Sequence, residues 1–190
     1  GDSTNPVGTF NSGDSAYAAS YSYAPNDRLS LGVTGKYITQ TIDVYSASAM
    51  AADLGVLYRV SPNAKRPVTL AASVRNVGNG IGYAGQTDPL PTTLVVAGAV
   101  AVTKGFVLDL DLGKSRDSNA YVALGGEGRR VITEGITGAL RAGFTSLRRD
   151  TGGLSGFAAG GGLSFPKASF DMAWVPFGPL GDAFRFSLLI

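Results

Sequence analysis

Hydrophobic side chains alternate with small or polar ones, at a period of two residues, along most of the chain from Asp14 onward. The clearest stretch is FVLDLDLG, in which Leu108 and Leu110 fall on one face while Asp109 and Asp111 fall on the other. A period of two is typical of a β-strand whose two faces meet different surroundings. The chain is therefore predicted to be all-β.

Segments with this pattern recur along the sequence and are separated by turn residues. The predicted strands cover residues 14–24, 29–43, 50–61, 68–78, 93–103, 106–113, 120–131, 136–148, 154–165, 168–176 and 183–190. Most come close to the roughly 9–11 residues with which a tilted strand crosses a bilayer. The longest uncharged apolar run, residues 94–102, is far shorter than the about 20 residues of a spanning helix.

The connections between these segments alternate in length. The short turns are residues 25–28, 62–67, 103–105, 132–135 and 166–167, and the longer links are residues 44–49, 79–92, 114–119, 149–153 and 177–182. Bacterial outer-membrane barrels have short periplasmic turns and longer external loops. We therefore expect the short turns and the C-terminus on the periplasmic side.

The polar face of the predicted strands carries Gly, Ala, Ser and Thr with single charges of both signs. A soluble sheet usually exposes many long charged side chains, yet charged residues make up only 16% of this chain, against about 25% in typical soluble domains. Small residues with sparse charges favour a confined interior in which opposite charges meet. The predicted lumen-facing charges are Asp53, Arg59, Arg75, Asp109, Asp111, Glu127, Arg129, Arg141, Asp171 and Arg185.

The apolar face is then predicted to contact lipid. Its residues include Leu54, Val56, Leu70, Val74, Leu108, Leu110, Val122, Leu124, Phe170, Met172, Trp174, Phe184, Phe186 and Leu188. Several aromatic residues lie near strand ends on this face, as they do in the girdles of membrane barrels. The alternative is a soluble or self-assembling β-protein with its apolar faces covered by protein, because both classes share the period of two.

The composition excludes several functions. The chain has neither Cys nor His, which removes thiol chemistry and the commonest zinc ligand, and its net charge of +2 is too balanced for a nucleic-acid surface. Asp109 and Asp111 resemble the start of a calcium loop, but the later ligands are missing. We predict no enzyme activity and no catalytic, cofactor or metal site.

Several motifs occur in an order that resembles the PorV/PorQ family, relatives of the FadL-type outer-membrane barrels. They are GTFNSGDSAYAASYSYA at residues 8–24, LSLGVTGKYI at 29–38, SASAMAADLGVLYR at 46–59, VRNVG at 74–78 and DPLPTTL at 88–94. The resemblance covers essentially the whole chain. It implies a fourteen-stranded barrel in the bacterial outer membrane that is not an enzyme.

The resemblance further implies an accessory or shuttle component of type IX-like protein secretion, with secretion proteins or cargo as partners. A FadL-like channel for hydrophobic small molecules is the alternative. Residues 1–190 are expected to form a single antiparallel up-and-down transmembrane β-barrel domain that lacks N-terminal strands, with eleven or twelve of fourteen strands present. Missing strands or further chains would complete it, since single-chain bacterial barrels have an even strand number; alternatively residues 4–11 supply a twelfth strand.

Overall fold

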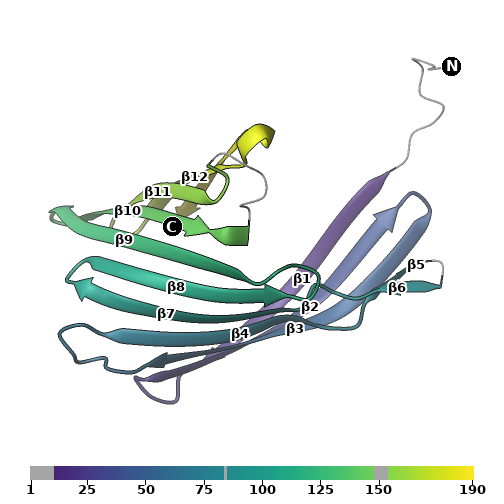
Figure 1. The fold of residues 1–190 in the computed structure, drawn as a ribbon, viewed down its shortest axis with the longest axis horizontal. Coiled ribbons are helices and arrows are strands. Elements are labelled where there is room, and N and C mark those ends of the chain that lie inside the picture. Colours follow the sequence, from purple (N-terminus) through teal and green to yellow (C-terminus); the bar gives the residue numbers. More distant parts are fainter. Residues whose placement is uncertain (1–10, 84, 148–153) are drawn as a thin grey trace.

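A computed structural model, which describes residues 11–83, 85–147 and 154–190, contains one large antiparallel sheet (Figure 1). In sheet order, its strands are β1 (Ser12–Tyr23), β2 (Leu29–Ile42), β3 (Tyr45–Arg59), β4 (Val68–Gly78), β7 (Thr93–Thr103), β8 (Phe106–Ser115), β9 (Tyr121–Thr133), β10 (Ile136–Thr145), β11 (Phe157–Ser164), β12 (Ser169–Pro176) and β13 (Asp182–Leu189). The 3-10 helix η2 (Gly178–Leu180) precedes β13. The all-β prediction is confirmed.

The sheet of 11 strands curls but does not close, because β1 and β13 remain its two edges. Every neighbouring pair is antiparallel. With an odd number of strands, β1 and β13 therefore run in the same direction. A direct pairing of these two edges would be parallel, so an all-antiparallel closure needs an odd number of additional strands.

Strand β3 is longer than predicted. It begins at Tyr45, so the predicted link over residues 44–49 is wrong, and only Asp43 and Val44 separate β2 from β3. The segment SASA lacks the contrast between large apolar and polar residues that marks a strand. Its alanines are nevertheless buried, Ala49 at 2% exposure. The alternation of short and long connections therefore fails at this turn.

The long link over residues 79–92 contains a small hairpin that the sequence pattern did not predict. It consists of β5 (Ile81–Tyr83) and β6 (Gln86–Asp88), which form a separate two-stranded sheet. Ile81 packs against a small cluster formed by Ala49, Ala51 and Leu90. Contacts distant in sequence thus hold this link against β3.

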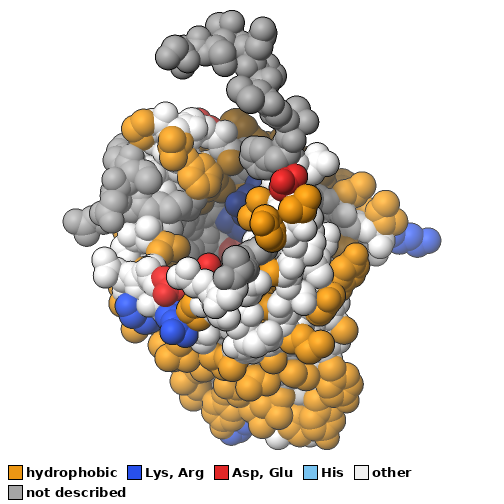
Figure 2. All heavy atoms as spheres, turned by 90° about the vertical axis from the view of Figure 1, so that its right-hand side faces the viewer, with side chains coloured by type: hydrophobic (Ala, Val, Ile, Leu, Met, Phe, Trp, Pro, Cys, Tyr) orange, Lys and Arg blue, Asp and Glu red, His pale blue; other side chains and the backbone are white. Residues whose placement is uncertain are grey.

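The large apolar side chains lie mostly on the surface of the sheet. Among the fourteen predicted lipid-facing residues, all but Val74 and Trp174 are exposed. Leu108 and Leu110, which would be covered in a two-layer sandwich, are 43% and 42% exposed. Viewed along the strands, hydrophobic side chains cover much of the lower outside, while charged side chains appear within the opening (Figure 2). No second layer of the described chain covers the apolar face.

Two further expectations concern the ends of the chain and helices. The alternative twelfth strand over residues 4–11 lies outside the described residues, apart from Asn11. Within the described ranges, no helix has the length and hydrophobicity that crossing a membrane requires.

Candidate functional site on the concave face

The strand registers place all ten predicted lumen-facing charges on the same, concave face of the sheet. Side chains of directly paired residues in an antiparallel sheet point to the same face. Arg141 is the partner of Glu127. Arg59 on β3 connects to Asp109 on β8 through the intervening partners Thr69 and Ala99. The alternation within each strand directs the neighbouring apolar residues to the opposite face. One side of a single sheet thus collects nearly all of its strand charges.

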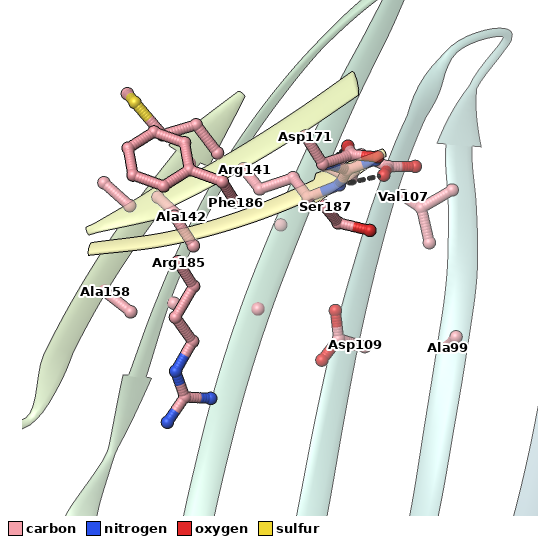
Figure 3. A pocket seen from close by; sticks show the side chains of 18 residues that line it. Ala99, Val107, Asp109, Arg141, Ala142, Ala158, Asp171, Arg185, Phe186 and Ser187 are labelled. Atoms are coloured by element: carbon pink, nitrogen blue, oxygen red, sulfur yellow. Dashed lines mark hydrogen bonds and ion pairs between the residues drawn. The ribbon is translucent and has the colours of Figure 1, made fainter. Parts of the chain in front are cut away.

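Four of these residues form a central ion-pair cluster: Glu127, Arg129, Arg141 and Asp171. Arg141 bridges two strands, because its Nε lies 2.6 Å from Glu127 Oε2 and its Nη1 lies 2.5 Å from Asp171 Oδ1. Arg129 Nε lies 2.5 Å from Glu127 Oε1. Figure 3 shows Arg141 and Asp171 meeting above the concave surface. The cluster joins β9, β10 and β12, and therefore spans β11 without a charge from that strand.

Glycines make room for the carboxylates of this face. Gly125 is the cross-strand partner of Asp109, and a Cβ on Gly125 would lie 2.5 Å from Asp109 Oδ1. Gly162 is the partner of Asp171, and a Cβ there would collide with the same carboxylate. These glycines allow the carboxylates to lie flat over the neighbouring strand.

The cluster borders a hollow of about 640 Å³, within the size range of small-molecule sites. Small side chains such as Ala99, Ala158 and Ala173 line much of it. Asp109 and Arg185 also line the hollow, and neither side chain has a hydrogen bond or ion pair with another described residue. Figure 3 shows both apart from the central ion-pair cluster. The hollow thus combines a lining of small apolar side chains with one unpaired charge of each sign.

A second group, the bulge network, consists of Lys36, Asp53 and Asn76. The register between β3 and β4 shifts between Ala52 and Leu54, so Asp53 faces an extra residue on β4. Asn76 adopts a φ of 57° there. The backbone N–H of Asn76 donates to Asp53 Oδ1 at 2.8 Å. The Oδ1 of Asn76 in turn accepts a hydrogen bond from Lys36 Nζ at 2.9 Å. Lys36 Nζ also lies 2.6 Å from Asp53 Oδ2.

The bulge network extends into the longer link over residues 79–92. Asn76 Nδ2 donates to the Pro91 carbonyl at 3.3 Å, and Thr92 Oγ1 donates to the Asn76 carbonyl at 3.0 Å. Asn79 Oδ1 accepts a bond from the Met50 backbone N–H at 2.7 Å. Asn76, within the motif VRNVG, therefore holds one end of the link, and Asn79, directly after the motif, holds the other.

The structure brings some predicted site residues together and leaves others apart. Ion pairs join Glu127, Arg129, Arg141 and Asp171, whereas the side chains of Arg75 and Asp111 make no ion pair or hydrogen bond within the described residues. Lys36 and Asn76 are absent from the predicted set. The alternation of β2 places Lys36 on the polar face, but no local signal identifies Asn76 as a bulge residue that contacts both Lys36 and Asp53.

The described concave face offers ion pairs, two unpaired charges and a hollow lined by small side chains. Within the described part of the chain, no three His, Cys, Asp or Glu side chains gather as a metal site. Comparison with protein-family models and with curated proteins finds no match to this chain. The resemblance to the PorV/PorQ family therefore rests on the sequence motifs alone.

Proposed function

We propose that this chain forms the wall of a bacterial outer-membrane β-barrel and works as a PorV-type accessory or shuttle component of protein secretion. The observation that carries the membrane part is the contrast between the two faces of one uncovered sheet. The apolar face exposes residues such as Leu124 and Phe186, at 54% and 65%, while the concave face gathers ion pairs. Hydrocarbon is the surrounding that suits the first face, and an enclosed lumen suits the second.

The barrel would close through strands that lie outside the described residues or come from another chain. An odd number of additional strands satisfies both edges of the sheet, β1 and β13, with antiparallel partners. The secretion role is supported by the family resemblance, and the anchored link over residues 79–92 provides a shaped surface at one rim of the barrel.

Membrane insertion is testable with the chain's one tryptophan, Trp174, which lies on the apolar face. The chain is folded into phospholipid vesicles with and without brominated acyl chains. We expect strong quenching of Trp174 by brominated lipid. A variant carrying Trp174→Phe and Ala158→Trp moves the tryptophan to the concave face and should be quenched weakly. Equal weak quenching of both proteins would reject the membrane proposal.

The secretion role is tested in the source bacterium. Deleting the gene should reduce surface delivery of secreted proteins while uptake of hydrophobic compounds stays unchanged. The hollow of about 640 Å³ favours a second candidate, a FadL-like channel for hydrophobic molecules. For that function, deleting the gene should reduce the uptake of hydrophobic compounds and leave the surface delivery of secreted proteins unchanged.

A further inference from the structure

We infer that the apolar face carries a specific site for an anionic phospholipid, at the end of the sheet where β9 turns into β10. This inference rests on the proposed membrane location. The site is a groove of about 480 Å³, here called the outer groove. Its floor consists of Gly128, Gly138 and Gly161, and its walls include Leu140, Phe170 and Met172.

The outer groove exists because glycines of three neighbouring strands lie in two adjacent rows of the apolar face: Gly128 and Gly161 flank Leu140 in one row, and Gly138 lies beside Arg130 in the next. Gly128 and Leu140 are cross-strand partners, and so are Leu140 and Gly161. The surrounding side chains project past this floor, with Leu140 at 76% and Met172 at 43% exposure. A cleft lined in this way matches a flexible hydrocarbon chain, which gains van der Waals contact on several sides.

A cation interrupts the apolar face at one end of the groove. Arg130 follows Gly128 on the outward-facing positions of β9, lines the groove, and is the partner of Gly138. A second cation, Lys167, lies in the neighbouring turn between β11 and β12. The two turns approach each other, because a Cβ on Gly135 would lie 3.4 Å from Pro166 Cγ.

Both cations are free to bind a ligand. The side chains of Arg130 and Lys167 make no ion pair or hydrogen bond with another described residue, and Glu134 in the turn beside them is paired with neither. An arginine recognises phosphate through parallel hydrogen bonds. An acyl chain in the groove with its phosphate at Arg130 therefore fits a phospholipid aligned along the strands, whose headgroup lies level with the short turns.

The test compares lipids retained by the full chain in mixed micelles, measured by native mass spectrometry. The probes are dioleoyl phosphatidylglycerol and dioleoyl phosphatidylcholine at equal concentration. We expect the wild-type chain to retain phosphatidylglycerol preferentially. Arg130→Gln should weaken this retention about tenfold, because it removes a charged hydrogen-bond donor. Gly128→Leu should weaken retention of both lipids, since the new side chain fills the groove.

Two matched variants serve as controls. Lys104→Gln removes a cation from the turn between β7 and β8, outside the groove. Gly98→Leu adds the same bulk to the apolar face elsewhere, where a Cβ would lie 3.6 Å from Leu70 Cδ2. Both should retain phosphatidylglycerol like the wild type. Equal retention by all five proteins, or no preference between the two lipids, would overturn the site.

The failure of this site is distinguishable from the failure of the proposed function. If brominated lipid quenches Trp174 but retention does not depend on Arg130 or Gly128, the lipid site is wrong while the membrane wall stands. If Trp174 is not quenched, both are wrong. Arg130→Gln keeps the test decisive if Gly128→Leu fails to fold, because it alters an exposed side chain without adding bulk.

Discussion

At the scale of single residues, the concave face is held together by ion pairs between side chains of different strands. Arg141 is the central example, because it contacts one carboxylate on β9 and another on β12. Its side chain is 39% exposed, so water screens part of this attraction. Its contribution to stability is therefore expected to be modest but measurable.

Replacing Arg141 by Met keeps much of the side-chain volume and removes the charge. We expect the free energy of unfolding to fall by about 1 kcal/mol, since Glu127 and Asp171 lose their shared partner. Urea unfolding in detergent micelles, followed by Trp174 fluorescence, measures the change. Arg116→Met, in the loop after β8, is the control and should leave stability unchanged. Equal effects of the two variants would contradict a stabilising role for the central ion-pair cluster.

The close approach of Asp109 to Gly125 gives a second residue-scale prediction. Gly125→Ala should destabilise the chain by about 1–3 kcal/mol, because the new Cβ would collide with the carboxylate. Adding Asp109→Ala should recover most of this loss, whereas Gly98→Ala alone should be tolerated. The same urea titration measures the coupling. Additive effects of the two substitutions would show that the carboxylate is not what excludes a side chain from Gly125.

At the scale of strands and turns, one of the register shifts in the sheet occurs where β3 meets β4. The bulge bends the sheet, and Asn76 supplies both the unusual backbone conformation and the hydrogen bonds to Lys36 and Asp53. Asn tolerates a positive φ better than most residues, and Gly tolerates it best. The two contributions of Asn76, conformational and bonding, are therefore separable by substitution.

Asn76→Gly removes the side-chain bonds but suits the backbone, while Asn76→Ala removes the bonds and adds strain. Both should destabilise the chain, and the Ala variant should be less stable than the Gly variant by about 1 kcal/mol. Thermal unfolding in micelles, monitored by circular dichroism, measures both. If the Ala variant is as stable as the Gly variant, the positive φ of Asn76 carries no energetic cost.

Strands in which large apolar residues alternate with polar or small ones were predictable from sequence, and segments without that alternation were not. In β8, leucines alternate with aspartates, so its position and its two faces follow directly from the pattern. In the first part of β3, Ser and Ala differ too little in hydrophobicity to show a period. The hairpin of β5 and β6 depends on packing against Ala49 and Ala51, which lie some thirty residues earlier.

The concave site was predictable only in part for the same reason. Alternation identifies which side Glu127, Arg141 and Asp171 share, but their pairing depends on the register of four strands. A shift of one residue would turn each of these side chains to the other face. The contact between Arg141 and Asp171, which are thirty positions apart, is a property of the assembled sheet.

At the scale of the whole molecule, the chain is a single curved layer with little core. Its buried hydrophobic residues, within the described ranges, are Ala47, Ala49, Ala51, Leu90 and Val175. A single sheet in water would leave its apolar face unprotected and its edge strands open to association. Its stability must therefore depend on what covers the outer face, which separates the membrane proposal from a self-assembling soluble protein.

A charge introduced at the middle of the apolar face distinguishes these two surroundings. Leu110→Arg should destabilise the chain in phospholipid vesicles by about 2–4 kcal/mol, the cost of a cation at mid-bilayer depth on a barrel. Ala99→Arg is the matched control, because it lies on the concave face as the partner of Asp109 and gains that carboxylate as a counter-charge. Urea unfolding in vesicles measures both variants. If Leu110→Arg instead makes the chain soluble and monomeric without detergent, then copies of the chain, and not lipid, cover this face.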